Sequence, residues 1–151
     1  MKSARYAVSA FILCGIALAA WADDEEDVAA AMAQWQERLA EASPEDPSEV
    51  VALYAEDAVL WGTISTERRD TPAAITDYFV NALNKLPELS VTFDDPHIRV
   101  YGDTAINTGA YTFSYEKDGK PATLPARYSF TYVKRDGDWM IVDHHSSAMP
   151  D

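Results

Sequence analysis

Apolar residues in the first half of the chain recur at the spacing of an α-helix. Between positions 23 and 42 they fall every three or four residues, which predicts a helix that buries one face and ends at Ser43-Pro44. The residues of this face are Val28, Met32, Trp35 and Leu39. Acidic residues crowd the start of the segment, where the helix dipole favours negative charge.

Three further elements are expected before the middle of the chain. A short helix opens at Asp46-Pro47, and a short apolar strand follows over residues 58–62. Residues 64–70 are polar and predict a loop. A longer helix over residues 71–84 is expected because Thr71 is a plausible cap and Pro72 suits the first helical position.

Beyond residue 89 the pattern changes from helical spacing to the alternation of β-strands. Four strands are predicted, over residues 90–101, 105–115, 122–134 and 139–147, and the first of them is expected to bend near Pro96. The last two are separated by Asp136-Gly137, a tight hairpin signal. Helices followed by a run of antiparallel strands predict one α+β domain.

The last strand holds two of the three histidines. Strict alternation places Trp139, Ile141, Asp143 and His145 on one face, and Met140, Val142, His144 and Ser146 on the other. His144 and His145 would then point in opposite directions and could not easily bind one ion. No metal site is therefore expected.

The chain starts with the features of a secretory signal peptide. Lys2 and Arg5 precede an apolar run, and Ala20-Trp21-Ala22 fits a cleavage site followed at once by acidic residues. We expect residues 1–22 to be removed on export, leaving residues 23–151 as a single domain in a bacterial periplasm. An uncleaved N-terminal anchor is the alternative. Cys14 is the only cysteine, so the mature form would have no thiol and no disulfide.

The charge of the chain excludes one class of partner. The formal net charge is −13, and loss of Lys2 and Arg5 would make the mature form −15. Nucleic-acid binding needs a basic face, so nucleic acid is not an expected partner. Anionic membrane surfaces are disfavoured for the same reason, and the acidity is best explained by solubility.

Two segments and the chain end resemble a known family. They are Asp95-Pro96-His97-Ile98-Arg99-Val100-Tyr101-Gly102-Asp103, then Arg135-Asp136-Gly137-Asp138-Trp139-Met140-Ile141-Val142, then His145, Ser147 and Pro150, with Phe79 and its helix fitting too. The chain from about residue 25 to 150 is similar to the SnoaL-like and nuclear transport factor 2-like proteins. Its best resemblance is to bacterial homologues of the association (hub) domain of calcium/calmodulin-dependent protein kinase II.

The resemblance implies a cone-shaped fold in which about three N-terminal helices pack on a curved, mainly antiparallel sheet, with an open pocket between them. It also implies a homodimer or a larger ring. It does not imply kinase activity, because the chain lacks the Gly-rich loop and the catalytic motifs of a kinase. No cofactor is expected.

One departure from the animal hub domain concerns its arginine-lined recess. In our alignment those positions hold Tyr111, Phe130 and Ser146, so a pocket for carboxylates does not carry over. Arg127 could supply one cation, but strand alternation places it on the opposite face from Phe130. A bulge would be needed to bring both to one recess.

Several residues are candidates for a ligand pocket. Aromatic residues with polar edges suit a small-molecule site, although core packing is the alternative for each of them and the preferred one for Trp35. The candidates are Tyr54, Trp61, Tyr78, Tyr111, Arg127 and His145. Arg127 must bind an anion, face solvent or pair with a carboxylate such as Asp57 or Asp143. The stripe Tyr128, Phe130 and Tyr132 is expected in the core or at a dimer interface.

His144 and His145 are the candidates for acid–base catalysis. Asp143 shares a face with His145 and could orient it, and Ser146 shares a face with His144, but no nucleophile elbow is present. Three functions are compatible with these residues: a pocket protein for a small organic ligand, a small isomerase, cyclase or hydrolase using a His/Arg/Tyr pocket, and a purely structural oligomerisation module. We favour the first because no complete catalytic set is visible.

Overall fold

The computed structural model describes residues 13–150 and, from Asp24 onward, their side chains. Its helices are α1 (Leu13–Glu41), α2 (Ser48–Val51) and α3 (Pro72–Lys85). Its strands are β1 (Tyr54–Trp61), β2 (Arg68–Arg69), β3 (Ser90–Tyr101), β4 (Thr104–Lys117), β5 (Lys120–Arg135) and β6 (Asp138–Ala148). The predicted α+β class is confirmed.

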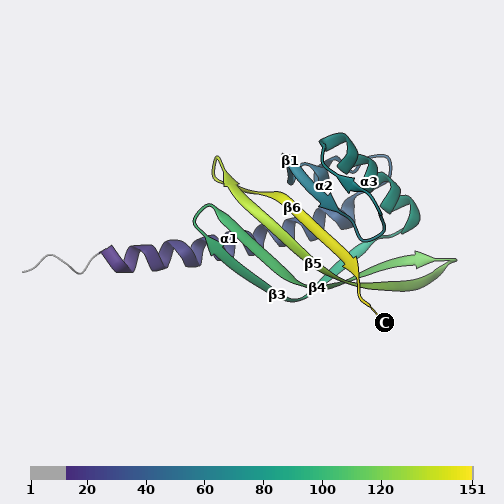
Figure 1. The fold of residues 1–151 in the computed structure, drawn as a ribbon. Helices are drawn as coiled ribbons and strands as arrows, with labels where there is room; N and C mark the ends of the chain where they lie inside the picture. The colour runs from purple at the N-terminus through teal and green to yellow at the C-terminus, as the bar shows by residue number, and fades with distance from the viewer. Residues whose placement is uncertain (1–12, 151) are drawn as a thin grey trace, which may run out of the picture.

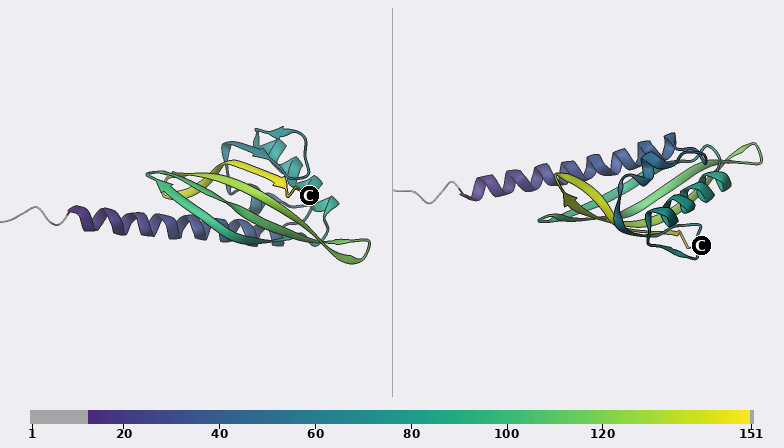
Figure 2. Two further views of the ribbon diagram at one scale, coloured as in Figure 1. Left: turned by 60° about the horizontal axis from the view of Figure 1, so that its bottom comes forward. Right: turned by 90° about the horizontal axis from the view of Figure 1, so that it is seen from above.

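All six strands form one sheet in the order β2-β1-β6-β5-β4-β3 (Figure 1). Strands β3 to β6 follow one another as an antiparallel meander, and β1 pairs with β6 in parallel. The long helix α1 lies behind the sheet in the view of Figure 1, and α3 lies beside the β1 end. Figure 2 shows the sheet curving around these helices. The face toward α1 and α3 is called the inner face below.

The predicted caps, turns and bend are found in place. The hydroxyl of Thr71 accepts a hydrogen bond from the backbone N–H of Ala74 at 3.2 Å, which caps α3. Asp136 and Gly137 both have positive φ angles, as a tight hairpin between right-twisted strands requires. The bend in β3 is a bulge: the register with β4 shifts between Asp94 and His97.

The structure corrects three boundaries in the first half of the chain. Helix α1 already begins at Leu13, ten residues before the predicted start, because the helix-favouring run before Asp23 continues it. Strand β1 begins at Tyr54, since pairing with β6 extends the strand through residues that were expected to break a helix. The predicted loop 64–70 contains β2, which pairs with the end of β1.

Only part of the predicted signal segment lies within the described residues. The predicted signal segment 1–22 overlaps residues 1–12, which lie outside the described residues. Within the described part of the chain, no helix is both long and apolar enough to cross a membrane.

The predicted alternation of the last strand is wrong beyond Ile141. Ile141 pairs with Tyr132 and Asp143 pairs with Thr131, so Val142 is an extra residue that forms a bulge. One extra residue reverses the faces of everything that follows. His144 therefore joins Ile141 on the inner face.

The core fills the space between the inner face and the helices. Trp35 and Leu39 of α1 are 1% exposed, and α3 contributes Ile75 and Phe79 at 1% and 2%. The stripe on β5 lies in this core, as the first of its two interpretations expected. Its members Tyr128, Phe130 and Tyr132 are all buried. Helices α1 and α3 thus pack over the inner face of the sheet beside His144.

Candidate functional site

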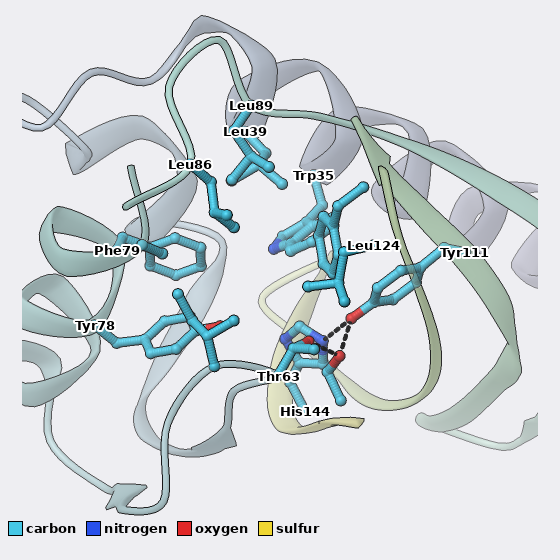
Figure 3. Close-up of a pocket in the computed structure, with 14 residues that line it drawn as sticks. Trp35, Leu39, Thr63, Tyr78, Phe79, Leu86, Leu89, Tyr111, Leu124 and His144 are labelled. Atoms are coloured by element: carbon cyan, nitrogen blue, oxygen red, sulfur yellow. Dashed lines mark hydrogen bonds between the residues drawn. The ribbon is translucent and has the colours of Figure 1, made fainter. Parts of the chain in front are cut away.

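A small cavity opens between α1, α3 and the inner face of the sheet (Figure 3). Its walls come from Trp35, Leu39, Thr63, Ile64, Tyr78, Phe79, Ala82, Leu86, Leu89, Tyr111, Phe113, Leu124, His144 and Ser146. The free volume of about 20 Å³ is room for roughly one water molecule. Any larger occupant must displace side chains of the wall.

A chain of buried hydrogen bonds runs along one wall of the cavity. The indole N–H of Trp35 donates to Tyr54 Oη at 3.1 Å, and Tyr54 Oη lies 2.8 Å from His144 Nδ1. On the other side of the imidazole, His144 Nε2 lies 3.5 Å from Tyr111 Oη (Figure 3). His144 therefore links a deep tyrosine to one at the cavity wall.

Two hydroxyl groups complete the chain. Tyr111 Oη donates to Ser146 Oγ at 2.5 Å, and Ser146 Oγ is also hydrogen-bonded to Thr63 Oγ1. Thr63 lies two residues after the end of β1, whereas Ser146 lies two residues after His144 on the same face of β6. The bulge at Val142 thus places His144 and Ser146 toward the cavity.

Burial keeps the ionisable groups around the cavity neutral. Desolvation, with a smaller contribution from the nearby charge of His145, lowers the pKa of His144 from 6.5 to about 3. Burial likewise raises the pKa values of Tyr54 and Tyr111 above their ordinary value. It raises the pKa of Tyr78 to about 12. At neutral pH the cavity therefore has polar but uncharged walls.

The structure divides the predicted site residues between two faces of the sheet. Tyr78 and Tyr111 line the cavity, and Tyr54 lies directly behind His144. Trp61 and His145 lie side by side at paired positions of β1 and β6 on the opposite face, where Trp61 is 42% exposed. The placement of His145 in one pocket with Tyr111 is therefore wrong, and the Val142 bulge is the reason.

Arg127 also lies on the opposite face. Its Nε donates to Ser147 Oγ at 3.1 Å, and among the described side chains it has no carboxylate partner within 4.0 Å. Asp57, one of its two expected partners, instead pairs with Arg135 at 2.9 Å. The predicted separation of Arg127 from Phe130 is confirmed, and Arg127 does not reach the cavity.

Two members of the site were missed or undervalued. Thr63 was not anticipated because it falls between the predicted strand 58–62 and the predicted loop 64–70. Trp35 was assigned to the core, where it does lie, but its N–H also starts the hydrogen-bond chain. The pairing of Ser146 with His144 was the sequence feature that pointed to this wall.

The exposed face offers a different group of polar residues. Arg127, Ser129, His145 and Ser147 surround a shallow depression there. Asp143 shares this face with His145, as predicted, and partial burial raises the pKa of its carboxyl group. Among the described residues, no group of three His, Cys, Asp or Glu side chains is placed to hold a metal ion.

Comparisons with known proteins identify the family of this fold. The family model of the calcium/calmodulin dependent protein kinase II association domain matches residues 24–150. A crystal structure from Xanthomonas campestris, assigned to that association domain, is 40% identical, with a TM-score of 0.74, over 82% of this chain and 86% of that chain. A search of curated proteins gave no significant match.

More distant structures share the fold alone. A nuclear transport factor 2-like protein with a cystatin-like fold from Novosphingobium aromaticivorans is 15% identical, with a TM-score of 0.74, over 93% of this chain and 92% of that one. The hub homology domain of the kinase from Chlamydomonas reinhardtii is 19% identical, with a TM-score of 0.65, over 81% and 97% of the two chains. On the family match and the 40% identity, this chain belongs to the calcium/calmodulin dependent protein kinase II association domain family and has the nuclear transport factor 2-like fold.

Proposed function

We propose that this protein is an exported, self-associating member of the association domain family that binds a small neutral organic molecule in its cavity and has no kinase activity. The observation that carries the proposal is the composition of the cavity wall. It is apolar apart from a buried hydrogen-bond chain, and none of its lining residues is Asp, Glu, Lys or Arg. Apolar walls with a few polar groups are typical of small-molecule sites.

The absence of charge in this wall restricts the ligand. A carboxylate or an ammonium group buried there would lose its hydration without gaining an opposite charge, which is costly. Position 146 is a serine and position 111 a tyrosine, so hydrogen bonding replaces ion pairing at this wall. The ligand is therefore neutral and mostly apolar.

Self-association is supported by the family and by the exposed face of the sheet. The family is named for association, and the Chlamydomonas relative is described as a hub homology domain. On the exposed face, Trp61 is 42% exposed, and Arg127 donates through Nε to Ser147 and has no carboxylate partner among the described side chains. Large aromatic and arginine side chains are enriched at protein interfaces.

Export is supported by the order of residues at the N-terminus, and the expected cleavage is compatible with one contact of the folded domain. Lys134 Nζ forms an ion pair with Asp24 at 2.7 Å, so the second residue after the expected cleavage site touches β5. Cleavage after Ala22 leaves this contact intact. Protein recovered from a bacterial periplasm should start at Asp23; material that starts at Met1 in the membrane fraction would contradict cleavage, and material that starts at Met1 in the cytoplasmic fraction would contradict export.

Self-association and ligand binding are tested together on residues 23–151. Native mass spectrometry should find two or more copies, with a neutral compound retained. A titration with methylenecyclohexane, followed by amide chemical shifts, should perturb Tyr111 and Ser146 but not Ser129. A monomer would contradict self-association, and unperturbed shifts would contradict the cavity proposal.

Matched variants separate cavity binding from surface binding. Ala82→Leu adds bulk to the cavity wall, whereas Thr123→Leu adds bulk at an exposed position of β5. The first should weaken methylenecyclohexane binding at least ten-fold, and the second should leave it unchanged. Equal effects of both variants would indicate non-specific binding.

A purely structural module is the second candidate, and the small cavity volume favours it. About 20 Å³ holds no organic ligand unless side chains move. The enzyme alternative is weakened because its His/Arg/Tyr set is not assembled: Arg127 lies on the face opposite the cavity. An assembly that binds no probe would leave the structural module as the function.

A further inference from the structure

The hydrogen-bond chain at the cavity wall has a fixed direction. The indole of Trp35 can only donate, so Tyr54 Oη accepts at that end. The hydrogen of Tyr54 must then go to another acceptor, and His144 Nδ1 at 2.8 Å is the acceptor that the described residues provide. Nδ1 is therefore unprotonated, and the neutral imidazole carries its hydrogen on Nε2.

The same direction continues from His144 to the cavity. His144 Nε2–H points toward Tyr111 Oη, and Tyr111 donates its own hydrogen to Ser146 Oγ. Either oxygen of the Ser146–Thr63 pair can donate, and a head-to-tail order, in which Ser146 donates to Thr63 Oγ1, lets the successive hydrogen bonds strengthen one another. In this order each hydroxyl passes its hydrogen to the next group along the chain.

The last hydroxyl therefore has a hydrogen without an acceptor. Tyr111, Ser146 and Thr63 supply three hydroxyl hydrogens, but only two hydrogen bonds join them in the described structure. Thr63 and Ser146 both line the cavity. The remaining hydrogen is thus available to whatever occupies it.

We propose that the ligand of this cavity carries an uncharged hydrogen-bond acceptor, a ketone or ether oxygen, which accepts from the Thr63 end of the chain. This inference rests on the proposed function, and it specifies the chemical class of the ligand. A group that can only donate would meet a donor and leave both unsatisfied. A charged group remains excluded by the neutral walls.

The size of the expected effect follows from a single neutral hydrogen bond. Such a bond adds roughly a three- to ten-fold gain in affinity over an isosteric group that cannot accept. The preference should depend on the Thr63 hydroxyl and not on the shape of the side chain. Thr63→Val keeps the shape and removes the hydroxyl.

The experiment compares four probes of one ring size on residues 23–151. Cyclohexanone is the acceptor, methylenecyclohexane is its isosteric hydrocarbon, and cyclohexylammonium and cyclohexanecarboxylate are the charged probes. Binding is measured from amide chemical shifts of Tyr111 and Ser146. We expect cyclohexanone to bind three to ten times tighter than methylenecyclohexane, and neither charged probe to bind.

Two variants decide the role of the hydroxyl. Thr63→Val should reduce the preference for cyclohexanone, because only Ser146 then has a free hydrogen, while leaving the affinity for methylenecyclohexane unchanged. Thr112→Val makes the same chemical change on β4, away from the cavity lining, and should leave both affinities unchanged. If Thr63→Val unfolds the protein, Thr63→Ser, which keeps the hydroxyl, must retain the preference.

The outcomes distinguish this inference from the proposed function. Equal binding of the ketone and the hydrocarbon, or a preference that Thr63→Val leaves unchanged, would overturn the acceptor assignment and leave cavity binding intact. Tighter binding of a charged probe would also overturn it. Failure of both neutral probes to bind would overturn the two proposals together.

Discussion

The imidazole of His144 stacks on the phenyl ring of Phe130, with ring centroids 3.9 Å apart and ring planes inclined by 24°. The two residues lie opposite each other on β5 and β6. The imidazole is 3% exposed and also meets the indole of Trp35 edge-on at 5.4 Å. An uncharged imidazole suits this aromatic environment, whereas a protonated one would be buried without a counter-charge.

The first prediction concerns stability at low pH. The pKa of His144 is about 3 in the folded state and near 6.5 when unfolded, so the unfolded chain binds the extra proton between these values. The stabilisation is therefore complete above pH 6.5 and is lost as pH falls toward 3, by about 1.4 kcal/mol per pH unit. Urea unfolding at several pH values measures this slope.

The matched variants for this prediction are His144→Gln and His145→Gln. The first removes the titrating group from the core, so the stability gap between wild type and this variant should shrink as pH falls from 6.5 to 4. His145→Gln keeps the buried imidazole of His144 and removes only the smaller contribution of the His145 charge, so this variant should retain most of the wild-type slope. A constant gap for His144→Gln would contradict the buried neutral imidazole.

How far the sequence could predict this site depended on the regularity of each element. The helix α3, the meander and the Asp136-Gly137 hairpin follow from local patterns of apolar residues and turn residues, which short segments carry by themselves. The inward position of His144 depends on one extra residue in β6. No local pattern marks Val142 as that residue, because a bulge is set by pairing with β5 and β1.

The same limit explains why the residues of the cavity could not all be predicted from the sequence. Thr63, at the end of β1, meets Ser146 of β6 only because these strands lie side by side, and the sequence separates the two residues by 83 positions. Polar residues in loops give no indication of their distant partners. Tyr78 and Tyr111 could be proposed because large aromatic residues with polar edges suit pockets in general.

The second prediction tests the bulge by chemical accessibility. His97 and His145 are exposed and His144 is buried. Alternation requires the two adjacent histidines to face opposite sides, and the bulge determines that His144 is the buried one. Diethyl pyrocarbonate should modify His97 and His145 in the folded protein and spare His144. Peptide mapping by mass spectrometry locates the adducts, with urea-unfolded protein as the control in which all three react.

Preferential modification of His144 would contradict the inward rotation of this residue. It would also remove the basis of the hydrogen-bond chain, because Tyr54 and Tyr111 would then lack their common partner. Protection of both adjacent histidines would instead indicate that self-association covers the exposed face, and dilution to the monomer should then restore reaction at His145 alone.

The third prediction contrasts two buried tyrosines. Tyr54 Oη serves both Trp35 and His144, whereas Tyr132 Oη is buried without a hydrogen-bond partner among the described residues. Tyr54→Phe should lower the free energy of unfolding by about 1–3 kcal/mol, because two buried groups lose their partner. Tyr132→Phe should leave it unchanged or raise it by up to about 1 kcal/mol.

Urea denaturation of the two variants measures this contrast directly, since both changes delete one hydroxyl from a buried ring. The order of the two stabilities is the decisive quantity. A larger loss for Tyr132→Phe would indicate an unrecognised partner of that hydroxyl, such as a trapped water, and would reduce the weight given to the chain through His144.

The fourth prediction concerns the contact between Gly62 and Tyr78. A methyl group at position 62 would overlap the ring of Tyr78, which forms one wall of the cavity. Gly62→Ala should therefore displace this ring or strain the core, at a cost of about 1–3 kcal/mol in the free energy of unfolding. Tyr78→Ala removes the obstacle, so adding Gly62→Ala to it should cost little.

The double-mutant cycle measures the coupling of the two positions, and a methylenecyclohexane titration measures its effect on the cavity. If the displaced ring moves out of the cavity wall, Gly62→Ala should change methylenecyclohexane affinity in the same direction as Tyr78→Ala. Strictly additive changes in the free energy of unfolding would contradict the contact between the two positions. Opposite changes in affinity would place the displaced ring inside the cavity, where it competes with the ligand for the space beside Thr63.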